Sequence, residues 1–364
     1  MKVGLVLGAG GVVGASWLIG ALEALASETG WDPARADHIV GTSAGSVIGA
    51  LCAAQVSAEE MGARVAGRAL AEVEEIEDRA QEMAERSLAA EYRPALALPP
   101  LGPGSWRLAV ATLRHPLQHP PGALLSGWLP RGFIRTDPIR QLVERFVPEG
   151  WPEHPNYWAV ACDYSTGARV AFGRDDAPAA QLGEAVAASC AIPAFYQPVS
   201  IAGRRYVDGG VCSLSNLDLL CGYGLDLVIC LNPTSSLAQM PARTPAERVA
   251  AAMRAASGRR LGHEARKLRE QGTEVLVIQP SAEDLKIMGA NLMSRQRRTE
   301  VIEQSVISTA GDLRSRRGSG HLLPEKSARS RRQARSGGAP EPTVAEPVAK
   351  RRVKSPAAKS SAAA

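Results

Sequence analysis

The stretch H-I-V-G-T-S-A-G-S-V-I-G-A-L-C-A-A, residues 38–54, is a short apolar run that leads straight into a helix of small residues. We predict a strand over 38–42 and a helix over 44–54. The same order occurs earlier, where the apolar run 3–7 is followed by a predicted glycine loop at 8–14 and by apolar residues at helical spacing up to residue 25. Two strand-to-helix units this close together predict an α/β fold with a central, mostly parallel sheet flanked by helices.

The rest of the chain continues this alternation. Thr244 and Glu247 form a capping box that predicts the start of a long helix ending at Gly272. A charged amphipathic helix is predicted over 57–92, and proline-rich sequence follows at 94–121, so that residues 57–130 form an insertion and a candidate lid. The other predicted elements are a helix at 182–189 and strands at 157–162, 168–172, 205–207, 225–231 and 274–278.

Charge is distributed unevenly along the 364 residues, whose net charge is +5. Residues 314–364 hold 13 Lys or Arg against 3 Asp or Glu and no Phe, Trp or Tyr, so their net charge is +10 and that of residues 1–313 is −5. We predict a globular domain over 1–313 and a disordered basic tail over 314–364. The tail is suited to peripheral contact with an anionic membrane, and the alternative is an extension that only keeps the protein soluble. Specific nucleic-acid binding is not expected, because no aromatic residues lie among the tail's basic ones.

Cysteine usage and the N-terminus indicate a cytoplasmic location. The six cysteines lie mostly in apolar runs without a C-x-x-C pair, which is typical of reduced, buried thiols and predicts no metal site. Residues 3–22 are uncharged, but six glycines interrupt them, whereas a signal sequence or a spanning segment is a continuous apolar helix. We therefore expect an intact N-terminus.

The sharpest local signal is G-x-S-x-G around Ser43, at the predicted strand-to-helix turn. A serine there must adopt strained backbone angles, and glycines at Gly41 and Gly45 leave the space for it. The hydroxyl of Ser43 would then leave the sheet above the positive end of the following helix, as a nucleophile does. The alternative is a Gly/Ser helix start that merely packs tightly against a strand.

The second signal is the glycine run with Gly8, Gly10, Gly11 and Gly14. Adjacent glycines allow main-chain N–H groups to point at an anion, either a phosphate or the oxyanion of acyl transfer. A dinucleotide fingerprint fails, because Val13 stands where its last glycine belongs, and no Gly-Lys-Ser/Thr of a phosphate-binding loop is present. Oxyanion binding is the interpretation that remains.

The third signal is Asp208-Gly209-Gly210, directly after the predicted strand 205–207. An aspartate at the end of a strand could accept a proton from a serine hydroxyl. D-G-G is also a common turn, so the motif gains its meaning from the other two signals.

No histidine is a convincing general base. An α/β-hydrolase triad of Ser43, Asp208 and His263 would need several strands before its nucleophile, but only one precedes Ser43. His263 lies in a charged helix, and prolines flank His115 and His119, so no helix aligns these two as metal ligands.

Taken together, the glycine loop, the early G-x-S-x-G and the late D-G-G resemble the patatin-like phospholipase family. The segment A-S-C-A-I-P at 188–193 and the T-G turn after Asp163 add to the resemblance, which covers about residues 3–232. It implies a three-layer fold and hydrolysis of lipid acyl esters without a cofactor, through a dyad in which Ser43 is the nucleophile and Asp208 the base. N–H groups of Gly10, Gly11 and Ala44 would form the oxyanion hole.

One position departs from the family pattern. The family commonly has Arg or Lys where Val13 stands, which weakens the expectation of phospholipid preference more than that of hydrolysis. An alternative is a catalytically inactive protein of the same fold that binds membrane surfaces through its basic tail.

Overall fold

A computed structural model describes residues 1–64, 104–114, 126–129, 134–148, 150–238, 240–241, 244–295 and 297–319, together with residues 132 and 324. Most of the predicted insertion at 57–130 and nearly all of the predicted tail lie outside these residues. Among the described helices, none is both long and apolar enough to cross a membrane.

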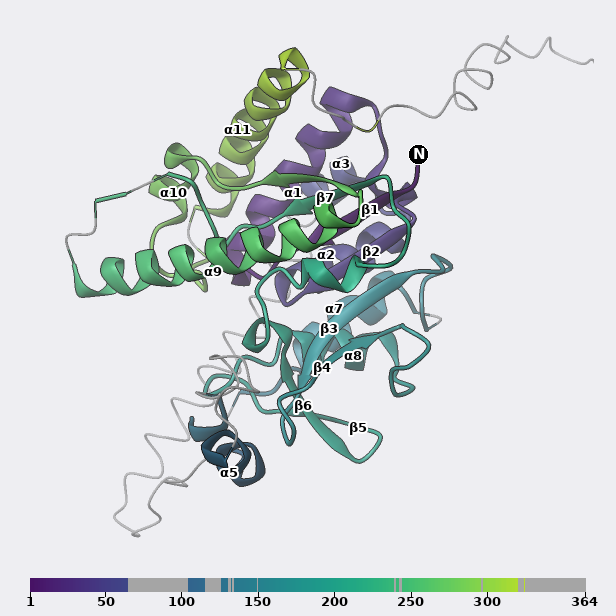
Figure 1. Cartoon of the computed structure of the whole chain (residues 1–364), viewed down its shortest axis with the longest axis vertical. Coiled ribbons are helices and arrows are strands. Elements are labelled where there is room, and N and C mark those ends of the chain that lie inside the picture. Colours follow the sequence, from purple (N-terminus) through teal and green to yellow (C-terminus); the bar gives the residue numbers. More distant parts are fainter. Residues whose placement is uncertain are drawn as a thin grey trace, which may run out of the picture. The chain divides into compact units, whose positions relative to one another are not determined.

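The described part of the chain contains one eight-stranded sheet (Figure 1), in the order β5-β6-β3-β2-β1-β7-β8, with β4 also paired to β3. The pairs β3–β2, β2–β1, β1–β7 and β7–β8 are parallel, and the pairs that join β4, β5 and β6 are antiparallel. The strands are β1 (Val3–Leu7), β2 (His38–Thr42), β3 (Tyr157–Asp163), β4 (Arg169–Phe172), β5 (Val199–Ile201), β6 (Arg204–Asp208), β7 (Leu227–Leu231) and β8 (Glu274–Ile278).

Helices cover both faces of the sheet, so the predicted three-layer α/β architecture is confirmed. Alternate residues of a strand point to opposite faces: Leu5 of β1 belongs to one core and Val6 to the other. The helices are α1 (Gly11–Thr29), α2 (Ala44–Ala53), α3 (Ala58–Arg64), α5 (Trp106–Arg114), α7 (Asp137–Phe146), α8 (Leu182–Ser189), α9 (Pro245–Glu270), α10 (Ala282–Met288) and α11 (Arg298–Gly318), with 3₁₀ turns η1 (Pro33–Arg35), η4 (Gly209–Val211) and η5 (Leu217–Leu220).

The two cores explain why the strands have continuous apolar runs. The first contains apolar side chains of α1, α2, α8 and α11, and the second contains those of α9 and η5. A strand buried on both faces needs apolar residues at every position, and all five residues of β1 and of β7 are buried.

The predicted elements largely match the structure, with two corrections. Helix α1 begins at Gly11, so the glycine loop spans only residues 8–10 rather than 8–14. Helix α11, which was not predicted, runs to Gly318 and so includes the first residues of the predicted tail; Arg314 on it pairs with Glu28 of α1. The capping box of Thr244 and Glu247 opens α9 as predicted, with both reciprocal hydrogen bonds formed.

Strand register brings three loops together at one edge of the sheet. Leu7 at the end of β1 lies opposite Gly41 of β2, and Thr42 lies opposite Val160 of β3. The antiparallel strand β6 places Asp208 opposite Ala161, the residue after Val160. The ends of β1, β2 and β6 therefore meet around β3.

Candidate active site

Ser43 occupies a sharp turn between β2 and α2. Its backbone has φ 52° and ψ −125°, a conformation that costs a non-glycine residue about 1–3 kcal/mol. A side chain at Gly41 would lie 2.5 Å from the Cα of Ser46, and one at Gly45 would collide with the carbonyl of Leu7. These collisions explain the two glycines that the sequence places around Ser43.

Hydrogen bonds hold the main chain on both sides of Ser43. Its N–H donates to the Oγ of Ser189 at 3.0 Å, and that hydroxyl in turn donates to the carbonyl of Val160 at 2.6 Å. The carbonyl of Ser43 accepts from the N–H of Ser46 at 2.7 Å. Ser189 lies in the A-S-C-A-I-P segment, which the sequence singled out without assigning this contact to it.

Asp208 ends β6 with its carboxylate beside Ser43. Its main-chain N–H donates to the carbonyl of Ala191 at 2.9 Å, and its Oδ1 accepts from the N–H of Gly210 at 2.7 Å. The Ser43 side chain lies close enough to this carboxylate to lower its pKa, as a hydrogen-bond donor does. At Gly209 a side chain would collide with the carbonyl of Val160, so glycine allows the close approach.

Burial controls the electrostatics of this pair. Both residues are 5% exposed, and desolvation raises the pKa of Asp208 from 3.8 to about 6, against the hydrogen bonds from Gly210 and Ser43, which lower it. A carboxylate with such a pKa is ionised near neutral pH but is a stronger base than an exposed aspartate.

The glycine loop follows β1 and lies against the Ser43 turn. The N–H groups of Gly8 and Ala9 are occupied, by the carbonyls of Leu231 and Leu214 at 2.9 and 2.8 Å. Within the described residues no acceptor is recorded for the N–H groups of Gly10 or Gly11, which begin α1.

Ala44, the first residue of α2, likewise has an N–H without a recorded acceptor in the described part of the chain. A side chain at Gly45 would lie 2.8 Å from the carbonyl oxygen of Gly8, so the two helix N-termini adjoin. Gly14 is already inside α1, where its N–H donates to Gly10. The arrangement supplies main-chain donors and two positive helix ends at one edge of the sheet.

The side chain of Val13 is buried in the core and is not exposed at this edge of the sheet. It is 1% exposed within the core, and its N–H donates to the carbonyl of Leu292 at 3.0 Å. That carbonyl would lie 2.7 Å from a side chain at Gly11, so the segment after α10 covers the start of α1. No pattern in the sequence indicates this contact.

The candidate histidines lie elsewhere. His263 is exposed on α9, as its charged surroundings predicted, and His115 and His119 lie outside the described residues. Within the part of the chain that is described, no group of three or more His, Cys, Asp or Glu side chains is arranged to hold a metal ion.

Asn216 is a site residue that sequence reasoning missed. It is fully buried, and its amide donates to the Oγ1 of Thr42, the residue before Ser43. The only sequence signal is its place in S-N-L-D, a few residues after the D-G-G motif.

Comparison with protein families agrees with this geometry. A family model described as Patatin-like phospholipase matches residues 5–220, which is more than half of the chain. The match includes the glycine loop, the Ser43 turn, the D-G-G motif and Asn216. The chain belongs to the patatin-like phospholipase family.

Proposed function

We propose that the protein hydrolyses acyl esters of lipids, with Ser43 as the nucleophile and Asp208 as its base. The observation that carries the proposal is a serine on a strained turn beside a buried aspartate, whose pKa burial raises to about 6. Membership of the patatin-like phospholipase family supports a lipid acyl ester as the substrate class.

The chemistry follows from these groups. Asp208 takes the proton of the Ser43 hydroxyl while its oxygen attacks the ester carbonyl and forms a tetrahedral oxyanion. The N–H groups of Gly10, Gly11 and Ala44 stabilise the oxyanion, and one such donor is typically worth about 2.7–4 kcal/mol. Asp208 returns the proton to the leaving alcohol and then takes one from the water that hydrolyses the acyl-enzyme.

Labelling and turnover test the assignment. We expect wild type to react with a fluorophosphonate probe and to hydrolyse short-chain nitrophenyl esters, and Ser43→Ala to do neither. Ser27→Ala is the matched control, because Ser27 is exposed near the end of α1. Undiminished turnover by Ser43→Ala would refute the proposal.

A lipid panel defines the substrate more closely. Since residue 13 is a buried valine, it supplies no cation for a headgroup. We therefore propose that ester hydrolysis does not require a phosphate, and that neutral acylglycerols are cleaved as well as phospholipids. Activity confined to phospholipids would contradict this part of the proposal.

We also propose that the basic segment 314–364 brings the enzyme to anionic lipid from the cytoplasm. Its support is the net charge of +10, a charge that attracts anionic surfaces without sequence-specific contacts. Part of this segment, up to Gly318, is the end of α11.

A further inference from the structure

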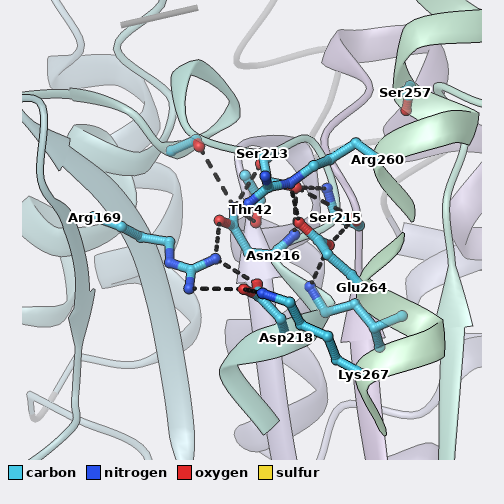
Figure 2. A network of polar contacts seen from close by, with 12 residues as sticks. Thr42, Arg169, Ser213, Ser215, Asn216, Asp218, Ser257, Arg260, Glu264 and Lys267 are labelled. Carbon is cyan, nitrogen blue, oxygen red and sulfur yellow. Dashed lines mark hydrogen bonds and ion pairs between the residues drawn. The ribbon is translucent and has the colours of Figure 1, made fainter. Parts of the chain in front are cut away.

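Asn216 joins the two halves of the proposed dyad (Figure 2). Its Nδ2 donates to the Oγ1 of Thr42 at 3.0 Å, to the carbonyl of Ser213 at 2.6 Å and, at a longer 3.4 Å, to the carbonyl of Gly209. Thr42 directly precedes Ser43, and Gly209 directly follows Asp208. One buried amide therefore contacts the main chain or side chain next to each reacting group.

The chemistry of these contacts requires an amide. Nδ2 faces the oxygens of Thr42, Ser213 and Gly209, whereas Oδ1 accepts from the guanidinium of Arg169 at 3.2 Å. An aspartate has nearly the same shape but no donor, so it would turn an oxygen toward two carbonyls. Asn216 also has a φ of 53°, a left-handed conformation that asparagine tolerates better than most residues.

The turn that carries Asn216 is held from α9. Glu264 of α9 is fully buried, and its Oε2 accepts from the Oγ of Ser215 at 2.6 Å and from the N–H of Leu217 at 3.0 Å. Its Oε1 accepts from Arg260 at 2.7 Å. A buried carboxylate is costly unless it is paired in this way, so these contacts fix Glu264 and the residues on both sides of Asn216.

A second ion pair holds the far side of the turn. Arg169 of β4 binds both carboxylate oxygens of Asp218, at 2.6 and 3.3 Å, and Lys267 of α9 lies 4.0 Å from the same carboxylate. Figure 2 shows Arg169 of β4 on one side of the turn and Glu264 and Lys267 of α9 on the other. The turn is thus held to two elements that are separate in sequence.

We propose that Asn216 is a positioning residue for the Ser43–Asp208 dyad, and that Glu264 of α9 acts through it by fixing the 213–217 turn. This inference rests on the proposed function and extends the site beyond residue 220, where the family match ends. Positioning matters because a misplacement of about 1 Å can lower a rate about 10²-fold.

The main test compares Asn216→Asp with wild type and Ser43→Ala on a nitrophenyl ester, well below each unfolding midpoint. We expect kcat of Asn216→Asp to fall at least about tenfold, which is about 1.4 kcal/mol, while KM stays within about threefold. Thr273→Val is the matched control: it removes a buried hydrogen bond to the carbonyl of Leu225, away from the proposed dyad, and should leave kcat unchanged.

Milder variants keep the inference testable if Asn216→Asp does not fold. Glu264→Gln keeps the shape of the side chain, and Ser215→Ala removes one of its donors; each should lower kcat about threefold or more at unchanged KM. Unchanged kcat in Asn216→Asp, or in both milder variants, overturns the inference while Ser43→Ala stays inactive. Equal turnover by wild type and Ser43→Ala would instead refute the proposed function.

Discussion

Asp208→Asn should change how the stability of the protein depends on pH. Burial raises the pKa of Asp208 from 3.8 to about 6 in the folded chain, so between these values the folded protein holds a proton that the unfolded chain has released. The stabilisation from this proton is complete below the unfolded pKa and is lost as pH rises through about 6. The rise of this pKa from 3.8 to about 6 corresponds to about 3 kcal/mol of unfolding free energy.

Urea unfolding of wild type and Asp208→Asn, followed by tryptophan fluorescence at steps from pH 4 to 7.5, measures this quantity. As pH rises from 4 to 7.5, wild type should lose most of that 3 kcal/mol of unfolding free energy relative to Asp208→Asn, because the amide does not ionise. Taking the difference between the two proteins removes the contribution of the other titrating groups to the pH dependence.

Ser43→Ala is the control for this measurement. It keeps the buried carboxylate and removes a hydrogen bond that lowers the pKa of Asp208, so its pH dependence should be at least as steep as that of wild type. The pH dependence of activity should report the ionisation of the same Asp208 carboxyl. We expect kcat/KM to fall as pH drops through about 6, because the protonated carboxyl cannot act as a base. A stability difference that stays constant with pH would refute the burial argument.

Two further predictions concern the Ser43 turn and the tail. Gly45→Ala should destabilise the protein by about 1–3 kcal/mol and abolish probe labelling, because its side chain would collide with the carbonyl of Leu7. Gly262→Ala on α9 is the control: it has open space around it and should stabilise the protein by about 0.5–1 kcal/mol. Denaturant unfolding measures both effects. Binding of the full chain to anionic vesicles should weaken as salt is raised from about 0.05 to 0.5 M, and sedimentation that is insensitive to salt would contradict the role of segment 314–364.

The positions of the proposed nucleophile and base could be predicted because their signals are local. Gly41 is needed because a side chain there would collide with Gly45 and Ser46, and Gly45 because one there would collide with Leu7 at the end of β1; both needs appear in the sequence as glycines two positions from Ser43. Asp208 follows the same logic, since the glycine after it permits close approach to β3. The strands buried on both faces could also be predicted, because they form continuous apolar runs in the sequence.

The supporting contacts could not be predicted, because they depend on residues far apart in the chain. Asn216 reaches Thr42 across 174 residues, and Ser189 reaches Ser43 across 146. Glu264 lies among charged residues of α9, and nothing in the local sequence distinguishes its buried carboxylate from exposed neighbours such as His263 and Arg266. Helix α11 was not predicted at all, and its last residues belong to the basic run from which a disordered tail was predicted, although Arg314 among them pairs with Glu28.

The position of β7 has a consequence for dividing the chain. The family match ends at residue 220, but β7 begins at Leu227 and lies beside β1 in the middle of the sheet, where the carbonyl of Leu231 accepts the N–H of Gly8. A fragment cut at residue 220 would leave β1 paired only with β2, as an edge strand, and would remove the acceptor of the Gly8 N–H in the glycine loop. A minimal fragment for expression must therefore retain β7, β8 and α9, since the boundary of the matched sequence passes through the interior of one compact unit.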